Sequence, residues 1–148
     1  MHIYISIGEQ KLSLFKGSEM VAEYAISSAA NGTGFDDGSY CTPTGRFEVS
    51  EKIGSNAPVG TIFKSREPVG VWDGTESDED MVLTRILRLH GLDAENANTM
   101  SRYIYIHGTN QETLLGQPTS CGCIRMSNKD VIDLYDRVET GILVTIGY

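Results

Sequence analysis

The alternation of apolar and polar residues predicts a chain built mainly from β-strands. Residues 2–7 carry isoleucine at every second position, which is typical of a strand with one buried face. Short turns rich in glycine and charged residues separate this stretch from two more expected strands, at residues 11–15 and 20–27. The chain is therefore expected to begin as a meander of three strands.

The same patterns predict the later elements. Residues 46–50, 103–106 and 142–146 read as strands, and the last is apolar enough to lie at the centre of a sheet. Residues 81–89 fit a strand or a short helix. Residues 54–80 show little periodicity and are rich in glycine, proline and acidic residues, so we expect a long solvated loop there.

One helix is expected, over residues 128–138. Ser127 is a typical N-cap residue, and Asp130 follows three positions later as in a capping box. The apolar residues of the segment recur at i, i+3, i+4 and i+7, and they are Val131, Leu134, Tyr135 and Val138. The fold class is thus mainly β with one helix, in a single domain of 1–148. The pattern alone leaves open whether this is a sandwich or a barrel.

Charge and composition exclude some function classes. The formal net charge of -8 argues against a nucleic-acid partner, because binding phosphates needs clustered Lys and Arg. The chain has no run of 18 apolar residues, so no membrane insertion is expected. Its start lacks the basic and apolar regions of a signal peptide. Three cysteines cannot all pair within the chain, which favours a reducing compartment. We therefore expect a cytoplasmic protein, or a periplasmic one if a leader has been removed.

The segment with the clearest chemistry spans residues 107–126 and reads HGTNQETLLGQPTSCGCIRM. A histidine follows an apolar strand-like run, and Ser-Cys-Gly-Cys follows a polar loop. A cysteine nucleophile needs a base, backbone donors for the oxyanion and a chain free to approach the substrate. This one segment contains residues able to supply all three.

The segment resembles the signature of the L,D-transpeptidase (YkuD-type) catalytic domain, in which His-Gly-Thr-Asn precedes Ser-x-Gly-Cys and Ile-Arg-Met. Residues 42–47, TPTGRF, resemble the TPTG turn of that family, and residues 3–27 resemble its opening hairpin. The resemblance covers nearly the whole chain. It implies a mixed-sheet β sandwich or barrel with the active site under a loop flap.

The resemblance also implies roles for individual residues. The nucleophile falls on Cys123 and the base on His107, with the backbone carbonyl of Gly108 orienting the imidazole. The backbone N–H groups of Cys121, Gly122 and Cys123 are candidate oxyanion donors. Many members carry a second histidine where this chain has Cys121, which points to altered substrate handling. The side chain of Cys121 could also fill a gap or be a redox partner of Cys123.

Several polar side chains are candidates for substrate binding. If its segment is extended, Arg125 points to the same side as Cys123 and could bind a substrate carboxylate through two hydrogen bonds. Ser120 could bond the loop or the histidine. Arg85 and Arg88 could also bind a carboxylate, or could be surface arginines.

The resemblance implies peptidoglycan stem peptides or muropeptides as partners, without a metal or an organic cofactor. Cys123 would attack the carbonyl of the third residue, a diamino acid, and expel D-alanine. Water would complete an L,D-carboxypeptidase reaction, which suits peptidoglycan recycling in the cytoplasm, whereas an amine would complete a transpeptidase reaction. A covalent carbapenem adduct is also implied. The alternatives are an inactive peptidoglycan-binding module and a zinc site, for which the ligands would be Cys121, Cys123, His107 and His90.

Overall fold

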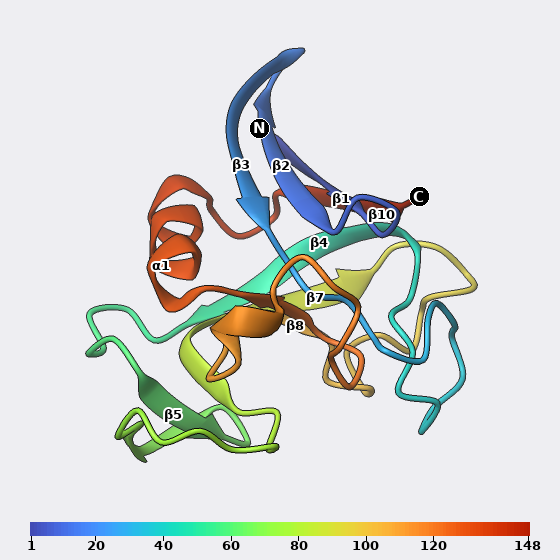
Figure 1. Cartoon of the computed structure of the whole chain (residues 1–148). Coiled ribbons are helices and arrows are strands. Elements are labelled where there is room, and N and C mark those ends of the chain that lie inside the picture. The colour runs from blue at the N-terminus through green and yellow to red at the C-terminus, as the bar shows by residue number, and fades with distance from the viewer.

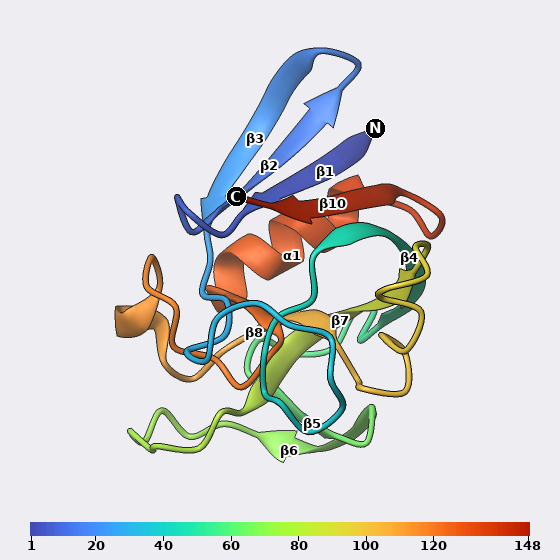
Figure 2. The ribbon, with the colours of Figure 1, turned by 90° about the vertical axis from the view of Figure 1, so that its right-hand side faces the viewer.

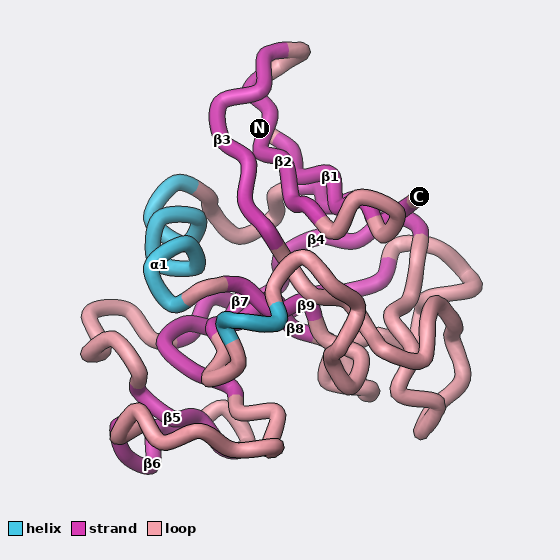
Figure 3. Tube along the Cα trace, viewed as in Figure 1, coloured by secondary structure: helices cyan, strands magenta, loops and turns pink.

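The computed structural model describes all residues from 1 to 148 and is mainly β (Figure 1). Figure 3 shows the strands, the two helical segments and the long loops between them. The elements are β1 (His2–Ser6), β2 (Lys11–Lys16), β3 (Glu19–Ala25), β4 (Gly45–Ile53), β5 (Thr61–Lys64), β6 (Glu67–Val71), β7 (Val82–Gly91), β8 (Tyr105–Gly108), the 3₁₀ helix η1 (Glu112–Leu114), β9 (Ile124–Met126), α1 (Asn128–Arg137) and β10 (Leu143–Gly147).

All ten strands belong to one mixed sheet, in the order β3-β2-β1-β10-β4-β7-β5-β6, with β8 paired to β7 and β9 paired to β8. The first three strands form the expected antiparallel meander. The last strand lies at the centre, as predicted. Val144 of β10 pairs with Ile3 of the parallel strand β1 and with Phe47 of the antiparallel strand β4.

The main core lies between this sheet and α1. Figure 2 shows β1, β2 and β3 above the helix, and β7 and β8 below it. The four apolar positions predicted to form one face of the helix are all buried in a cluster of 20 residues; they are Val131, Leu134, Tyr135 and Val138. The helix is too short to cross a membrane, and no other helix of the chain is long and apolar enough to do so. The predicted fold class, mainly β with one α-helix, is confirmed.

The structure corrects the prediction of a continuous loop over residues 54–80. This stretch contains the β5–β6 hairpin, whose two strands pair antiparallel. Every residue of β6 is exposed, and the strand contains Pro68 and Gly70. An edge strand with no buried face shows no alternation, so the sequence pattern did not reveal it. The ambiguous residues 81–89 lie in strand β7, which is buried along most of its length.

Strands β7, β8 and β9 lie side by side and carry the segment with the predicted chemistry. β8 runs antiparallel to β7 and parallel to β9, and His107 of β8 pairs with Arg125 of β9. Residues two positions apart in a strand share a face of the sheet. The register therefore gives the side chain of His107 the same face as that of Tyr105.

Candidate active site

His107 is held in one orientation by the backbone that follows it. Its Nδ1 lies 2.6 Å from the carbonyl oxygen of Gly108, to which it donates a hydrogen bond. A Cβ on Gly108 would lie 2.5 Å from Asn128 Oδ1 and 2.7 Å from the Leu83 carbonyl oxygen, so only glycine fits there. With the proton on Nδ1, the other ring nitrogen, Nε2, is free to accept one.

The imidazole of His107 is kept uncharged by its surroundings. Its side chain is buried, and burial lowers its pKa below the ordinary value. The negative charge of Asp80 and the Gly108 carbonyl act in the opposite direction, and the nearby Arg125 adds to the lowering. A neutral imidazole is the form that can take a proton from a thiol.

Cys123 lies directly before β9, beside Tyr105. Its sulfur accepts a hydrogen bond from the Tyr105 N–H at 3.3 Å and donates one to the Tyr103 carbonyl at 3.3 Å. No hydrogen bond joins the sulfur to His107 in the free protein. Burial raises the pKa of this thiol to about 12, so the resting form is the neutral S–H.

The predicted oxyanion donors differ in availability. Ser120 Oγ donates to the Cys123 carbonyl at 2.7 Å and accepts from the Gly122 N–H at 3.1 Å. The Gly122 N–H is therefore already bonded, which corrects its predicted role as an oxyanion donor, and the glycine instead permits a φ of 130°. The Cys121 N–H donates to Asp80 Oδ2 at 3.0 Å. The amide of Cys123 itself makes no hydrogen bond within the chain.

Arg125 lies within the site but is not exposed. Its side chain is 0% exposed, and its guanidinium donates to Asp80 Oδ1 at 3.3 Å, to Gln111 Oε1 at 2.5 Å and to Thr119 Oγ1. The carboxylate at this arginine in the free protein is thus that of Asp80, and a substrate carboxylate would have to replace it.

The other two predicted arginines, Arg85 and Arg88, lie on β7 beside β8, but neither forms a hydrogen bond or ion pair with Cys123 or His107. The Arg85 guanidinium donates to the backbone carbonyls of Ala57 and Thr84 and lies over the ring of Tyr135. Arg88 pairs with Glu51 at 3.6 Å and donates to the Met100 carbonyl at 3.4 Å. Both side chains are thus occupied by partners within the chain, and their predicted role in substrate binding stays a prediction.

Two residues near the site were not predicted. Arg66, at the turn of the β5–β6 hairpin, donates to the Tyr105 hydroxyl at 3.0 Å, and its guanidinium lies over the Tyr103 ring. Both tyrosines also bond the Cys123 sulfur through their backbones. Asp80 belongs to the acidic run that was expected to be a solvated loop. No local signal identifies either residue, because both reach the site through contacts distant in sequence.

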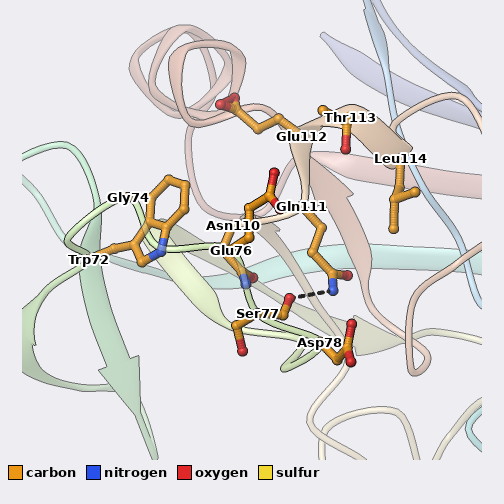
Figure 4. A pocket seen from close by; sticks show the side chains of 10 residues that line it. All are labelled: Trp72, Gly74, Glu76, Ser77, Asp78, Asn110, Gln111, Glu112, Thr113 and Leu114. Atoms are coloured by element: carbon orange, nitrogen blue, oxygen red, sulfur yellow. Dashed lines mark hydrogen bonds between the residues drawn. The ribbon is translucent and has the colours of Figure 1, made fainter.

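Cys121 and Asp80, which are joined by a hydrogen bond, each line a cleft. One, of about 390 Å³, is lined by Cys121, Tyr40, Arg102 and Tyr103 among others. The other, of about 490 Å³, is lined by Asp80 and residues of β5 and β7. A third, polar pocket of about 520 Å³ lies between Trp72 and the segment after His107 (Figure 4). Neither Cys123 nor His107 lines any of these three cavities.

Comparisons with known proteins agree with this geometry. The family model described as the L,D-transpeptidase catalytic domain, YkuD, matches residues 1–146. The chain belongs to this family. The resemblance seen in the sequence is thereby confirmed.

Two relatives from Bacillus subtilis match short stretches of the chain. The chain is 56% identical over 41 residues to the putative L,D-transpeptidase YkuD of Bacillus subtilis, covering 28% of the chain and 25% of the relative. It is 43% identical over 56 residues to the putative L,D-transpeptidase YqjB of the same organism, covering 38% and 31%. The matched stretches are thus about a quarter to a third of the length of these relatives.

Solved structures share the fold over nearly the whole chain. An L,D-transpeptidase from Mycobacterium smegmatis has a TM-score of 0.64 and 15% identity, covering 99% of this chain and 58% of that one. L,D-transpeptidase 3 from Mycobacterium tuberculosis, in complex with a faropenem-derived adduct, has a TM-score of 0.59 and 20% identity, covering 99% and 59%. At these identities the likeness establishes the fold alone.

Proposed function

We propose that the protein is a cysteine acyl-enzyme peptidase or acyltransferase that acts on peptidoglycan stem tetrapeptides, at the bond between diaminopimelate and D-alanine. The observation that carries this proposal is the buried, neutral His107, fixed by the Gly108 carbonyl, on the strand beside Cys123. Such a pair suits proton transfer from thiol to imidazole. The family membership supplies the substrate class.

The proposed mechanism begins with two uncharged groups. The Cys123 thiol turns from the Tyr103 carbonyl towards His107, whose Nε2 takes the proton as the sulfur attacks the scissile carbonyl. The unbonded Cys123 N–H stabilises the oxyanion. When the C–N bond breaks, the imidazolium returns the proton to the amine of D-alanine. Water then attacks the thioester, which releases the tripeptide and regenerates the thiol.

Hydrolysis is our first proposal for the fate of the acyl-enzyme. In the cytoplasm, where we propose that the protein works, it would meet soluble tetrapeptides, and trimming them is a recycling reaction. Transfer to an amine is the second candidate. It is favoured by the two clefts beside the Cys121–Asp80 contact, which offer room for a second peptide. Acylation by faropenem-type β-lactams is proposed from the adduct in the solved relative.

Mass spectrometry of the products tests the proposal. The protein is incubated with a diaminopimelate-containing tetrapeptide, with and without a free D-amino acid, alongside Cys123→Ala. Release of D-alanine that disappears in the variant would support the proposed chemistry. Tripeptide as the main product would support hydrolysis, whereas dimers or exchanged stems would favour transfer. Turnover unchanged in Cys123→Ala would contradict the assignment of the nucleophile.

A further inference from the structure

We infer that the Cys121 N–H and the Arg125 guanidinium form an anion-binding subsite beside Cys123, which Asp80 occupies in the free protein and which a substrate carboxylate takes over. The inference deepens the proposed function and rests on it only in assuming that Cys123 is the reacting group. It makes Asp80 a gate that an anionic ligand displaces.

Asp80 binds this subsite with both of its oxygens. Oδ2 accepts from the Cys121 N–H at 3.0 Å, and Oδ1 accepts from the Arg125 guanidinium at 3.3 Å. A backbone amide and a guanidinium that converge on one carboxylate are the donors with which proteins bind carboxylate ligands. Asp80 therefore takes the place that a ligand of the same chemistry would fill.

The burial of Arg125 explains why an anion should exchange with Asp80. The arginine is 0% exposed, and Asp80 is its one carboxylate partner. A buried cation left without a counter-ion is strongly unfavourable. Opening the site without a ligand leaves such a cation, whereas replacing Asp80 by a substrate carboxylate keeps the charge paired. Opening is thus coupled to the binding of an anion.

The segment that carries Asp80 is attached to the fold in a way that permits its release. Residues 72–81 contain no strand or helix, and 73–79 are exposed. Asn110 holds the segment by accepting from the Met81 N–H and donating to the Glu79 carbonyl, both at 3.1 Å. Gln111 adds a bond to the Ser77 carbonyl at 3.0 Å (Figure 4). A segment held by a few side-chain bonds can open without disrupting the core.

The hydrogen bond between the Cys121 N–H and Asp80 lies next to two clefts. Cys121 lines the cleft of about 390 Å³, and Asp80 lines the cleft of about 490 Å³. The hydrogen bond between these two residues therefore links the lining of one cleft to the lining of the other. Displacement of Asp80 would therefore break this link and leave the Cys121 N–H and the Arg125 guanidinium to the substrate carboxylate.

Two alkylating reagents of the same size and different charge test the gate. Iodoacetate and iodoacetamide each form an S–C bond with Cys123, with loss of iodide and of the thiol proton. Their rates are compared in the wild type, Asp80→Asn and Asp78→Asn, and tandem mass spectrometry assigns the modified cysteine. We expect Asp80→Asn to raise the iodoacetate rate, relative to the iodoacetamide rate, by about tenfold or more, since a charge-assisted hydrogen bond is lost. Asp78→Asn removes the same charge from the same segment without touching the subsite, and should leave the ratio within about twofold.

The variant Asn110→Ala shows whether the alkylation rates respond to release of residues 72–81, and not only to the loss of the Asp80 charge. This variant keeps every charge and removes two of the hydrogen bonds that hold the segment. The ratio of the iodoacetate rate to the iodoacetamide rate should therefore rise, as in Asp80→Asn. If Asp80 is only a fixed counter-ion, Asp80→Asn will lower the melting temperature and leave the ratio unchanged, which would overturn the inference. If Asp80→Asn does not fold, Asn110→Ala decides, and an unchanged ratio there also overturns it. Because alkylation needs no turnover, failure of the gate is distinguishable from failure to release D-alanine.

Discussion

At the scale of single residues, burial controls the chemistry of the site. It raises the pKa of Cys123 and lowers that of His107, so both groups rest in their uncharged forms. A free cysteine has a pKa near 8.5, so its reactivity levels off above about pH 9. The site is therefore built to move the proton during attack on a bound substrate, instead of storing a thiolate.

The pH dependence of thiol reactivity tests this resting state. With a pKa of about 12, the thiolate fraction of Cys123 increases about tenfold per pH unit across the neutral range. We expect the logarithm of the rate of Cys123 alkylation by iodoacetamide, measured by mass spectrometry, to rise by about one per pH unit from about pH 6 to pH 10. The alkylation rate of glutathione, a free thiol that serves as the control, should level off near pH 9. A plateau for Cys123 below pH 8 would show a preformed thiolate–imidazolium pair and contradict this prediction.

The fit around Gly108 gives a second prediction. Gly108→Ala places a Cβ at 2.5 Å from Asn128 Oδ1 and 2.7 Å from the Leu83 carbonyl, so β8 has to shift and the His107 orientation is lost. We expect a loss of about 1–3 kcal/mol in the free energy of unfolding, measured with denaturant, and a fall in turnover. Gly70→Ala, whose Cβ would meet nothing within 4 Å, is the matched control. Equal effects of the two substitutions would show that this fit is unimportant.

At the scale of elements, the start of α1 supports the site as well as the core. Ser127 Oγ accepts from the Asp130 N–H at 3.0 Å, so the predicted N-cap is present. The next residue, Asn128, is buried and donates to the Thr109 carbonyl at 2.9 Å, two residues beyond His107. The cap therefore fixes the residue that connects the helix with the end of β8.

Removing this cap should destabilise the protein measurably. Ser127→Ala leaves an N–H of the first helical turn without its partner, and we expect it to lower the free energy of unfolding by about 1 kcal/mol. Chemical denaturation followed by circular dichroism measures the change. Ser18→Ala, in the exposed turn between β2 and β3, is the control and should have little effect. If Ser127→Ala were as stable as this control, the cap would not contribute.

The elements also show where sequence patterns succeed and fail. The helix was predictable because its cap and apolar stripe lie within a dozen consecutive residues. His107 and Cys123 were predictable because the motif that contains them is local. β6 was missed because an exposed strand has no alternation, and Asp80 was missed because its partner Cys121 lies 41 residues away. The burial of Arg125 and its ion pair with Asp80 could not be predicted either, because both depend on residues far from Arg125 in the sequence.

At the scale of the whole molecule, stability is distributed unevenly. The main core is one cluster of 20 buried residues, from α1 and from the face of the sheet that packs against it. The β5–β6 hairpin rests on a second cluster of only three buried residues, Phe63, Ile86 and Tyr105, against which Cys123 also packs. A part of the fold with few buried contacts opens at lower free energy than the rest. The part that covers the nucleophile is thus the part most able to move.

Hydrogen exchange tests this division. In the wild type, we expect the amides of β5, β6 and residues 72–81 to exchange well before those of β1, β7 and β10. Phe63→Ala truncates the one buried residue that the hairpin contributes to the small cluster. It should speed exchange in the hairpin while leaving the strands of the main core protected. Leu87→Ala, in the main core, should instead reduce protection in the central strands, because it lowers global stability by about 2–5 kcal/mol. If the hairpin and the central strands lost protection together in Phe63→Ala, the molecule would open as one unit, and access to Cys123 would require global unfolding.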